Sequence, residues 1–267
     1  MLVEGGEVER NLLRAERMIE LAAMKGADLV LLPECLDTGW THPSCKTAAQ
    51  PIPGKTSNRL AEGARKWGVY VVAGITERDG EKIFNSGVLI SPNGETLLKH
   101  RKINELDIAQ HLYSTGDSLA VANTPIGTIG INICADNLPG SLPLGHALAR
   151  MGAQIILSPC AWAVPVGYNH IEQPYADEWI PSYTTLANLY RISMVGVSNV
   201  GVISEGPWSG WKCIGCSLAV NAEGKVAYVA SYGESAEECK VIDLQLEPRF
   251  FTGTALVEEI CRRGYCE

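Results

Sequence analysis

The sequence lacks the features that would tie it to nucleic acid, a membrane or the secretory route. It has 267 residues and a net charge of −8, with no long run of acidic or basic residues. This balance disfavours nucleic acid and anionic membranes as main partners. No apolar stretch is long enough to span a bilayer, and the first residues do not show the basic and then apolar pattern of a signal peptide. We therefore expect a cytoplasmic protein.

A disulfide framework and a zinc-binding pattern are also absent. The nine cysteines are odd in number and scattered, and several lie in apolar runs, which is typical of a reducing compartment. Cys213 and Cys216 form a CxxC pair, but Cys261 and Cys266 are spaced too widely to supply the second pair of a zinc site. We expect no structural metal.

Helical patterns alternate with short apolar strands along the chain. Helices are predicted at residues 7–25, 56–67, 142–151 and 180–193. Strands are predicted at residues 28–33, 69–74, 84–91, 96–102, 121–124, 127–134, 152–158 and 194–198, with a further hairpin at 216–229. No linker or low-complexity segment divides the chain, so we expect a single domain over residues 1–267 with a layered, mixed sheet.

Three chemically distinct side chains follow three of the predicted strands. Glu34 ends the run Leu-Leu-Pro-Glu, Lys102 ends a strand that carries His100, and Cys134 ends the run Gly-Ile-Asn-Ile-Cys. If these strand ends meet, a carboxylate, an ammonium and a thiol lie together, and this set is sufficient for cysteine-based acyl transfer.

Each of the three also has a simpler interpretation, and both remain open at this point. Taken alone, a cysteine that ends an apolar strand is more commonly a buried core residue, Glu34 fits a carboxylate in solvent, and Lys102 fits part of a solvated edge strand. In the functional interpretation, Glu34 is a general base and Lys102 stabilises a thiolate and an oxyanion. The turn after Cys134 can direct the backbone N–H of Ala135 at that oxyanion.

The ordered set of motifs resembles the nitrilase superfamily of carbon–nitrogen hydrolases. The resemblance covers about residues 7 to 245 and rests on segments that are individually unspecific but collectively ordered. These are Leu31–Glu34 with Thr38–Trp40, Arg101–Lys102 after a Pro-Asn-Gly turn, Tyr113–Asp117, Gly130–Cys134, Leu157–Trp162, Ser198–Gly201 and Gly215–Ser217.

The resemblance implies a four-layer α-β-β-α sandwich and a Glu–Lys–Cys site without metal or organic cofactor. Glu34 is then the general base, Lys102 the electrostatic stabiliser and Cys134 the nucleophile that forms a thioester. The implied reaction hydrolyses a non-peptide C–N bond of a small linear amide or N-carbamoyl compound, releasing ammonia or an amine. The implied assembly is a homodimer or a larger homo-oligomer.

The sequence departs from the family pattern around the second glutamate that members usually carry. That position is occupied by Ala109, with Gln110 beside it. The missing side chain could be supplied by Glu105, Asp107 or Gln110. We select Glu105, which lies three residues after Lys102. Ala135 stands where amidase branches often have tyrosine and nitrilases have tryptophan. Asp136 follows it as in many amidases, which favours amides over nitriles.

Two further expectations concern the start of the chain and the pocket. Family members begin with a strand before the first helix, whereas residues 1–6 lead straight into that helix, so we expect the first N-terminal strand to be missing and a sheet edge to be open. Trp162, just after a strand end, is selected as a substrate-pocket wall. The loop 206–211 is expected to be exposed and to cover a site or contact a second subunit.

Alternative functions remain. One is a nitrilase or an acyl transferase that uses the same cysteine. The other is a catalytically impaired binding protein, which the absent second glutamate and the absent strand make more credible.

Overall fold

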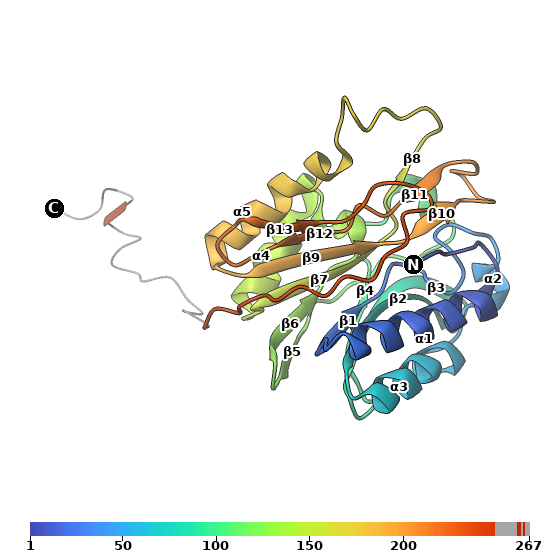
Figure 1. Cartoon of the computed structure of the whole chain (residues 1–267), viewed down its shortest axis with the longest axis horizontal. Coiled ribbons are helices and arrows are strands. Elements are labelled where there is room, and N and C mark those ends of the chain that lie inside the picture. The colour runs from blue at the N-terminus through green and yellow to red at the C-terminus, as the bar shows by residue number, and fades with distance from the viewer. Residues whose placement is uncertain (249–260, 263, 265–267) are drawn as a thin grey trace.

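The computed structural model describes residues 1–248, 261, 262 and 264 (Figure 1). Its helices are α1 Val8–Met24, α2 Cys45–Ala48, α3 Lys55–Trp67, α4 Leu142–Arg150 and α5 Ile180–Tyr190. No helix in this part of the chain is long and apolar enough to cross a membrane. The four longer helices match the segments predicted from helical periodicity.

The smaller sheet carries the first half of the chain. Its strands lie in the order β1 Leu29–Leu31, β2 Tyr70–Asp79, β3 Lys82–Ile90 and β4 Thr96–Arg101. β1 pairs in parallel with β2, and the other neighbours are antiparallel. The β-branched and aromatic residues of Val69–Val72 favour the extended chain, and strand β2 continues five residues beyond the predicted end at Gly74.

The larger sheet carries most of the second half. Its order is β13 Val226–Val229, β12 Leu218–Val220, β9 Ser193–Ser198, β7 Ile155–Cys160, β6 Gly127–Ile131 and β5 Val121–Thr124. β6, β7 and β9 are parallel, so their carboxyl ends lie at one edge of the sheet. β6 ends at Ile131, three residues before the predicted end at Cys134.

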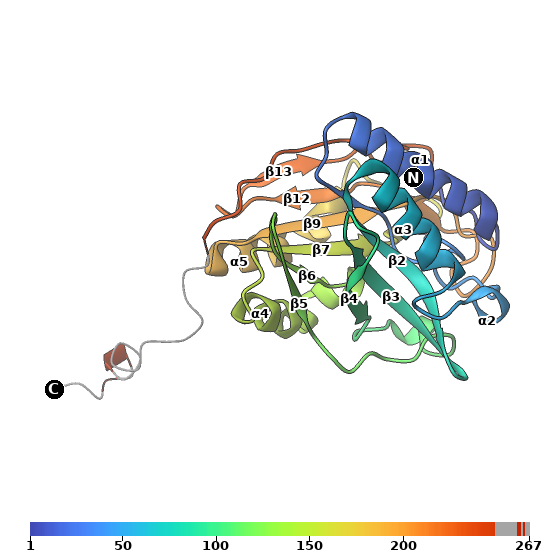
Figure 2. The same ribbon diagram turned by 90° about the horizontal axis from the view of Figure 1, so that it is seen from below.

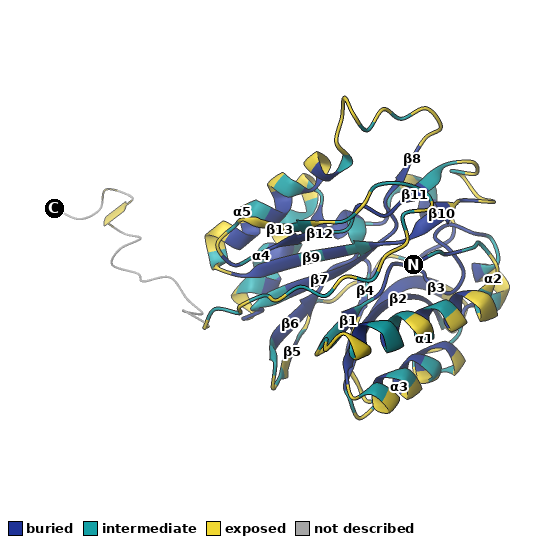
Figure 3. Ribbon diagram, in the orientation of Figure 1, coloured by how far each residue is buried: buried dark blue, intermediate teal, exposed yellow. Residues whose placement is uncertain are grey.

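The two sheets face each other and each is covered by helices on its outer side (Figure 2). Helices α1 and α3 pack on the smaller sheet, where Leu12, Ile19 and Leu60 are completely buried. Helices α4 and α5 pack on the larger sheet. Between the sheets lies an apolar layer that includes Val72 and Leu89 from one side and Ile131 and Leu157 from the other. The molecule therefore has α, β, β and α layers, and burial is concentrated in the strands (Figure 3).

A third, three-stranded sheet was not predicted from the sequence. It consists of β10 Val200–Val202, β11 Lys212–Ile214 and β8 Ala163–Val164, in that order. The loop 206–211 connects β10 to β11, and its Trp208 packs edge-on against Trp40 at a ring-centroid distance of 5.0 Å. Through this contact, the loop 206–211 of the third sheet lies against the segment that follows β1.

Candidate active site

Glu34 lies at the carboxyl end of β1, in the gap between the two sheets. Its backbone N–H donates to the C=O of Cys160 at 3.2 Å, which ties the end of β1 to the end of β7 in the larger sheet. The neighbouring strand approaches so closely that a Cβ atom at Gly74 would lie 2.5 Å from the Cα of Glu34. Only glycine fits at position 74 without moving the Glu34 backbone.

Lys102 follows β4 and points into the same gap. Residues alternate across a strand, so His100 and Lys102 face inward while Lys99 and Arg101 face outward, as the sequence predicted. Both inward side chains are buried, and both outward cations pair with Glu77 at 2.6 Å. The strand therefore separates a buried amine from a surface network of charges.

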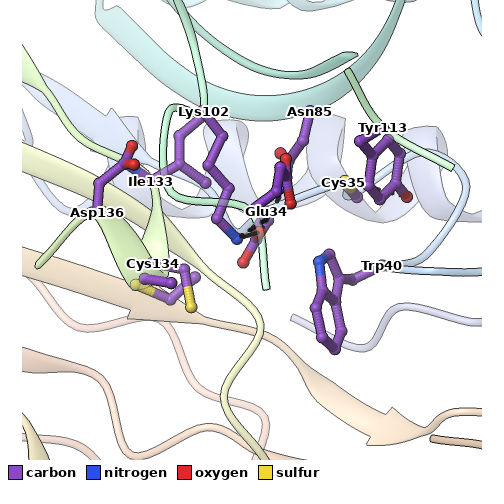
Figure 4. A network of polar contacts seen from close by, with 12 residues as sticks. Glu34, Cys35, Trp40, Asn85, Lys102, Tyr113, Ile133, Cys134 and Asp136 are labelled. Carbon is purple, nitrogen blue, oxygen red and sulfur yellow. Dashed lines mark hydrogen bonds and ion pairs between the residues drawn. The ribbon is translucent and has the colours of Figure 1, made fainter. Parts of the chain in front are cut away.

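Glu34, Lys102 and Asn85 form one buried hydrogen-bonded cluster (Figure 4). The Lys102 Nζ donates to Glu34 Oε1 at 2.7 Å, and the Asn85 Nδ2 donates to the same oxygen at 2.6 Å. Burial alone would lower the pKa of Lys102, but the negative charge of Glu34, and of Glu105 and Cys134 whenever they are ionised, raises it well above its usual value. Lys102 therefore stays charged at neutral pH.

Cys134 comes from the opposite sheet and lies beside this pair. It begins the short 3-10 helix η2, Cys134–Asn137, with a φ of +44°, a conformation that non-glycine residues rarely adopt. Its backbone N–H donates to Ser158 Oγ on β7 at 3.0 Å. Figure 4 shows its side chain close to the Lys102 amine and to Glu34.

The thiol of Cys134 is protonated in the resting protein. A hydrogen bond with Cys160, burial and the negative charge of Glu34 raise its pKa well above the usual value, while Lys102 acts in the opposite direction. A thiol in this state is a weak nucleophile until a base removes its proton. Glu34 is the carboxyl group at hand to do so.

Glu105, selected from its spacing to Lys102, does lie in the cluster. Its Oε2 is 3.8 Å from Lys102 Nζ, and neither carboxyl oxygen has a hydrogen-bond partner among the described residues. Burial raises the pKa of Glu105 to about 8, further supported by Glu34 and Asp136 and opposed by Lys102. At pH 7 the Glu105 carboxyl group is therefore mostly neutral.

The turn that carries Cys134 is fixed by Asp136. The Asp136 Oδ1 accepts from the backbone N–H groups of Ile103 and Asn104 at 3.1 and 2.7 Å, and Oδ2 accepts from Ile133 N–H at 2.9 Å. The Asn104 side chain donates in turn to the C=O of Ala135 at 2.8 Å. The segment after Lys102 and the turn after Cys134 are therefore held by one carboxylate.

The two tryptophans differ in where they lie. Trp162, the predicted pocket wall, is 1% exposed and stacks on Trp179 at 5.0 Å within the core of the larger sheet, in a cluster that packs against Cys134. Trp40 instead presents its ring to Lys102, with Nζ 5.7 Å from the ring centroid. The structure thus brings Trp40, and through it Trp208 of the loop 206–211, next to the cluster.

Sequence reasoning missed Asn85 and Ser158, which hold Glu34 and the Cys134 backbone. Each is a polar residue inside an otherwise apolar strand, and both are completely buried. A buried polar residue in such a strand needs a partner, and that was the available signal. Among residues 1–248, 261, 262 and 264, no group of three or more His, Cys, Asp or Glu side chains is arranged to hold a metal ion.

Comparison with known proteins extends these observations. A model of the carbon–nitrogen hydrolase family matches residues 5–248. A nitrilase of Pyrococcus abyssi is 32% identical over 246 residues, covering 90% of this chain and 85% of that protein. The omega-amidase NIT2 of Xenopus tropicalis is 34% identical over 172 residues, and the match covers 61% of this chain and 62% of that relative. The chain thus spans less than two thirds of the omega-amidase.

The fold leads to the same group of proteins. The crystal structure of Nit3 from Saccharomyces cerevisiae, a member of branch 10 of the nitrilase superfamily, matches with a TM-score of 0.73 and 25% identity over 88% of this chain and 84% of that one. Since the family model covers nearly the whole described region, this chain belongs to the carbon–nitrogen hydrolase family, within the nitrilase superfamily.

Proposed function

We propose that the enzyme hydrolyses the C–N bond of a small linear amide or N-carbamoyl compound through a thioester on Cys134. The observation that carries the proposal is the 2.7 Å contact between Lys102 and Glu34, buried between the sheets and facing Cys134. A buried ion pair is expensive to desolvate and is weak evidence for stability. Because the Lys102–Glu34 pair lies beside the partly exposed thiol of Cys134, we infer that its role is catalytic rather than stabilising.

The first half of the reaction forms the thioester. Glu34 removes the thiol proton from Cys134, and the sulfur attacks the amide carbon, so that a C–S bond forms and the carbonyl π electrons move to oxygen. The charged Lys102 and the backbone N–H of Ala135 stabilise this oxyanion; the N–H of Cys134 itself is already donated to Ser158. One such donor is typically worth about 3 kcal/mol of barrier. Glu34 then returns the proton to the leaving nitrogen, the C–N bond breaks, and ammonia or an amine departs.

The second half releases the acid. Glu34, again a base, takes a proton from water as the water oxygen attacks the thioester carbon. The C–S bond breaks, Cys134 recovers its proton, and a carboxylic acid leaves. Lys102 stabilises the second oxyanion as it did the first. The same three side chains therefore serve both steps.

Glu105 is proposed to replace the second glutamate of the family. Because its pKa is about 8 and its carboxyl oxygens are unpartnered, it is mostly a neutral carboxylic acid at pH 7. Its O–H is then free to donate to the carbonyl or the amide of a bound substrate. Burial disfavours the ionised form of Glu105 and therefore keeps the proton that this role requires.

We propose amides rather than nitriles as substrates, although the relatives include both amidases and a nitrilase. The omega-amidase relatives favour an amide, and Asp136 after Ala135 is the amidase-like feature of the sequence. The Pyrococcus abyssi relative is named a nitrilase, so conversion of a nitrile to an acid is the second candidate. An acyl transferase would give an acylated acceptor instead of free acid.

The deciding experiment is an ammonia-release screen over linear amides, ureido acids and nitriles, with free acid measured in parallel. We expect release from amides or ureido acids, its loss in Cys134→Ala, and its retention in Cys213→Ala, which removes a buried thiol of β11. Intact-mass measurement during turnover is expected to show a substrate adduct on the parent and none on Cys134→Ala. Release of ammonia by Cys134→Ala, or no turnover of any compound, would refute the proposal.

The assembly proposed from the family resemblance is a homodimer or larger homo-oligomer. Light scattering coupled to size-exclusion chromatography gives the mass directly. A particle of 28.8 kDa at micromolar concentration would contradict it.

A further inference from the structure

A second cysteine, Cys160, lies beside Cys134 on the neighbouring strand of the larger sheet. Strands β6 and β7 run in parallel (Figure 1), and their last paired residues are Ile131 and Leu157. Cys134 and Cys160 each lie three positions beyond that pair, and neighbouring strands are about 4.8 Å apart. The Cα atoms of two disulfide-bonded cysteines are usually about 4.4–6.8 Å apart. The spacing of the two chains at this end of the sheet therefore suits a disulfide.

Ser158 contacts both cysteines. Its Oγ accepts from the backbone N–H of Cys134 at 3.0 Å and lies 3.3 Å from the Sγ of Cys160. Ser158 and Cys160 are two positions apart on β7, so their side chains leave the same face of the strand. The thiols of Cys134 and Cys160 are also hydrogen-bonded to each other, and this bond makes the largest contribution to the raised pKa of Cys134. The two sulfur atoms are therefore neighbours while both are still reduced.

The two thiols differ in their access to solvent. Cys134 is partly exposed, whereas Cys160 is 0% exposed and packs in the core between the larger sheet and its helices. A small oxidant that enters from solvent therefore meets Cys134 first. The thiolate is the form that reacts, and Glu34 and Lys102 lie beside Cys134 as a base and a cation that favour it (Figure 4). The hydrolysis proposed above, by contrast, makes no use of the thiol of Cys160.

We propose that Cys134 and Cys160 form a reversible disulfide when the protein meets hydrogen peroxide. Cys160 is then the resolving cysteine, which captures the oxidised sulfur of Cys134. A sulfenic acid without such a partner is oxidised further to sulfinic and sulfonic acids, which thiol reductants do not restore. The buried thiol of Cys160 therefore protects the proposed nucleophile from irreversible oxidation, and a thiol reductant returns both residues to their starting state.

The oxidation takes place in two steps. Glu34 takes the thiol proton of Cys134, and the sulfur attacks one oxygen of the peroxide. The O–O bond breaks, and the departing hydroxide takes the proton from Glu34 and leaves as water, so that Cys134 is now a sulfenic acid. The sulfur of Cys160 then attacks the sulfenic sulfur, an S–S bond forms, and the S–O bond breaks. The hydroxide leaves with the thiol proton of Cys160, so two thiols and one peroxide give one disulfide and two waters.

Digestion with trypsin identifies this disulfide directly. Cleavage after lysine and arginine gives the peptides 103–150 and 151–191, whose only cysteines are Cys134 and Cys160 respectively. The full chain is treated with excess hydrogen peroxide, its remaining thiols are blocked with iodoacetamide in denaturant, and it is digested without reductant. We expect the two peptides to be joined in one species, with a mass about 2 Da below the sum of the free peptides. Dithiothreitol is expected to separate them.

Two matched variants test the role of Cys160. Cys160→Ser keeps a small polar side chain without the resolving thiol, and Cys213→Ala removes a buried thiol of β11 instead. After peroxide and then dithiothreitol, the peptide 103–150 of the parent and of Cys213→Ala is expected to regain its unmodified mass. In Cys160→Ser it is expected to keep an increase of about 32 or 48 Da on Cys134. The fraction of Cys134 that is recovered as thiol is expected to be at least about fivefold lower in Cys160→Ser than in the parent.

Three results would overturn the proposal. One is oxidation of Cys134 in the parent without the joined peptides. Another is equal recovery of Cys134 in the parent and in Cys160→Ser. The third is a disulfide that joins two copies of the chain, seen as a dimer on a non-reducing gel. The measurement on the parent needs no variant, so it decides the question even if Cys160→Ser fails to fold. All readouts are masses, so this test is independent of the proposed hydrolysis.

Discussion

His100 Nε2 lies 2.9 Å from Asp136 Oδ2, and this contact links the strand that leads to Lys102 with the turn that carries Cys134. Both residues are buried, and each lies two positions from one of the proposed reacting side chains, Lys102 and Cys134. The hydrogen bond from His100, together with those from the backbone, lowers the pKa of Asp136 despite its burial. Asp136 is therefore an ionised anchor between the two sheets.

We predict that Asp136→Asn lowers kcat/KM by about 10- to 100-fold, because a hydrogen bond to a charged group is worth about 1.5–3 kcal/mol and its loss shifts Cys134 relative to Lys102. The matched control is Glu77→Gln, which removes the carboxylate bonded to the outward face of the same strand β4. Glu77→Gln is expected to lower Tm with kcat/KM nearly unchanged. If Tm and activity fall together in both variants, Asp136 affects activity only through the stability of the fold.

We predict that Glu105 imposes an upper pH limit on activity. Its pKa is raised to about 8, so the neutral acid is lost as pH rises through about 8, and kcat/KM is expected to fall there. Glu105→Gln keeps a neutral donor of similar shape and is expected to move or remove that limb of the pH profile. An unchanged profile in the variant would show that another group titrates.

The same raised pKa affects stability with a defined sign. Between about pH 4.5 and 8, the folded protein holds a proton on Glu105 that the unfolded chain has released. The contribution of this group to the free energy of unfolding therefore decreases as pH rises across that window. We expect the Tm difference between Glu105→Gln and the parent to increase from pH 5 to pH 8, as followed by scanning calorimetry.

We predict that Lys102→Met destabilises the fold as well as abolishing turnover. It leaves Glu34 buried without its cation, and breaking a buried pair in this way typically costs about 3–5 kcal/mol. The double variant Lys102→Met, Glu34→Gln removes both charges and is expected to recover most of the Tm while remaining inactive. Denaturant unfolding and ammonia release, measured on both variants, separate the two effects.

The two tryptophans give a contrasting prediction. Trp40→Leu removes the ring that faces Lys102, an interaction worth about 0.5–2 kcal/mol, and is expected to lower kcat/KM with a smaller effect on Tm. Trp162→Leu is expected mainly to lower Tm, because that ring fills the core beside Trp179. A change in KM for Trp162→Leu at unchanged Tm would instead support the pocket wall predicted from the sequence.

Local patterns are enough to predict the four longer helices, most strands and the three strand-end side chains, but not the short helix α2. The period of the apolar residues predicts helices such as α1 and α3, and alternation along β4 correctly separated His100 and Lys102 from Lys99 and Arg101. The superfamily was recognised from the order of the motifs and is confirmed by the family match. The roles proposed for Glu34, Lys102, Cys134, Glu105, Ala135 and Trp162 stay predictions.

What the sequence could not supply depends on contacts between distant segments. Strands β8, β10 and β11 are two or three residues long and exist because they pair with one another, which local composition does not reveal. The end of β6 was placed at Cys134 because the apolar run continues to it, whereas the backbone has already turned to a positive φ there. Asn85 stands out only as a polar residue in an apolar strand, and its sequence position does not identify its partner Glu34, which lies 51 positions away.

The origin of Glu34 and Lys102 in one sheet and of Cys134 in the other has a consequence for folding. Neither layer alone contains all three of the proposed reacting groups, so catalysis is expected to begin only after the two halves of the sandwich have docked face to face. Regain of turnover during refolding therefore reports assembly of the layers, and it is expected to lag behind the far-ultraviolet circular dichroism signal, which records secondary structure formed within each layer.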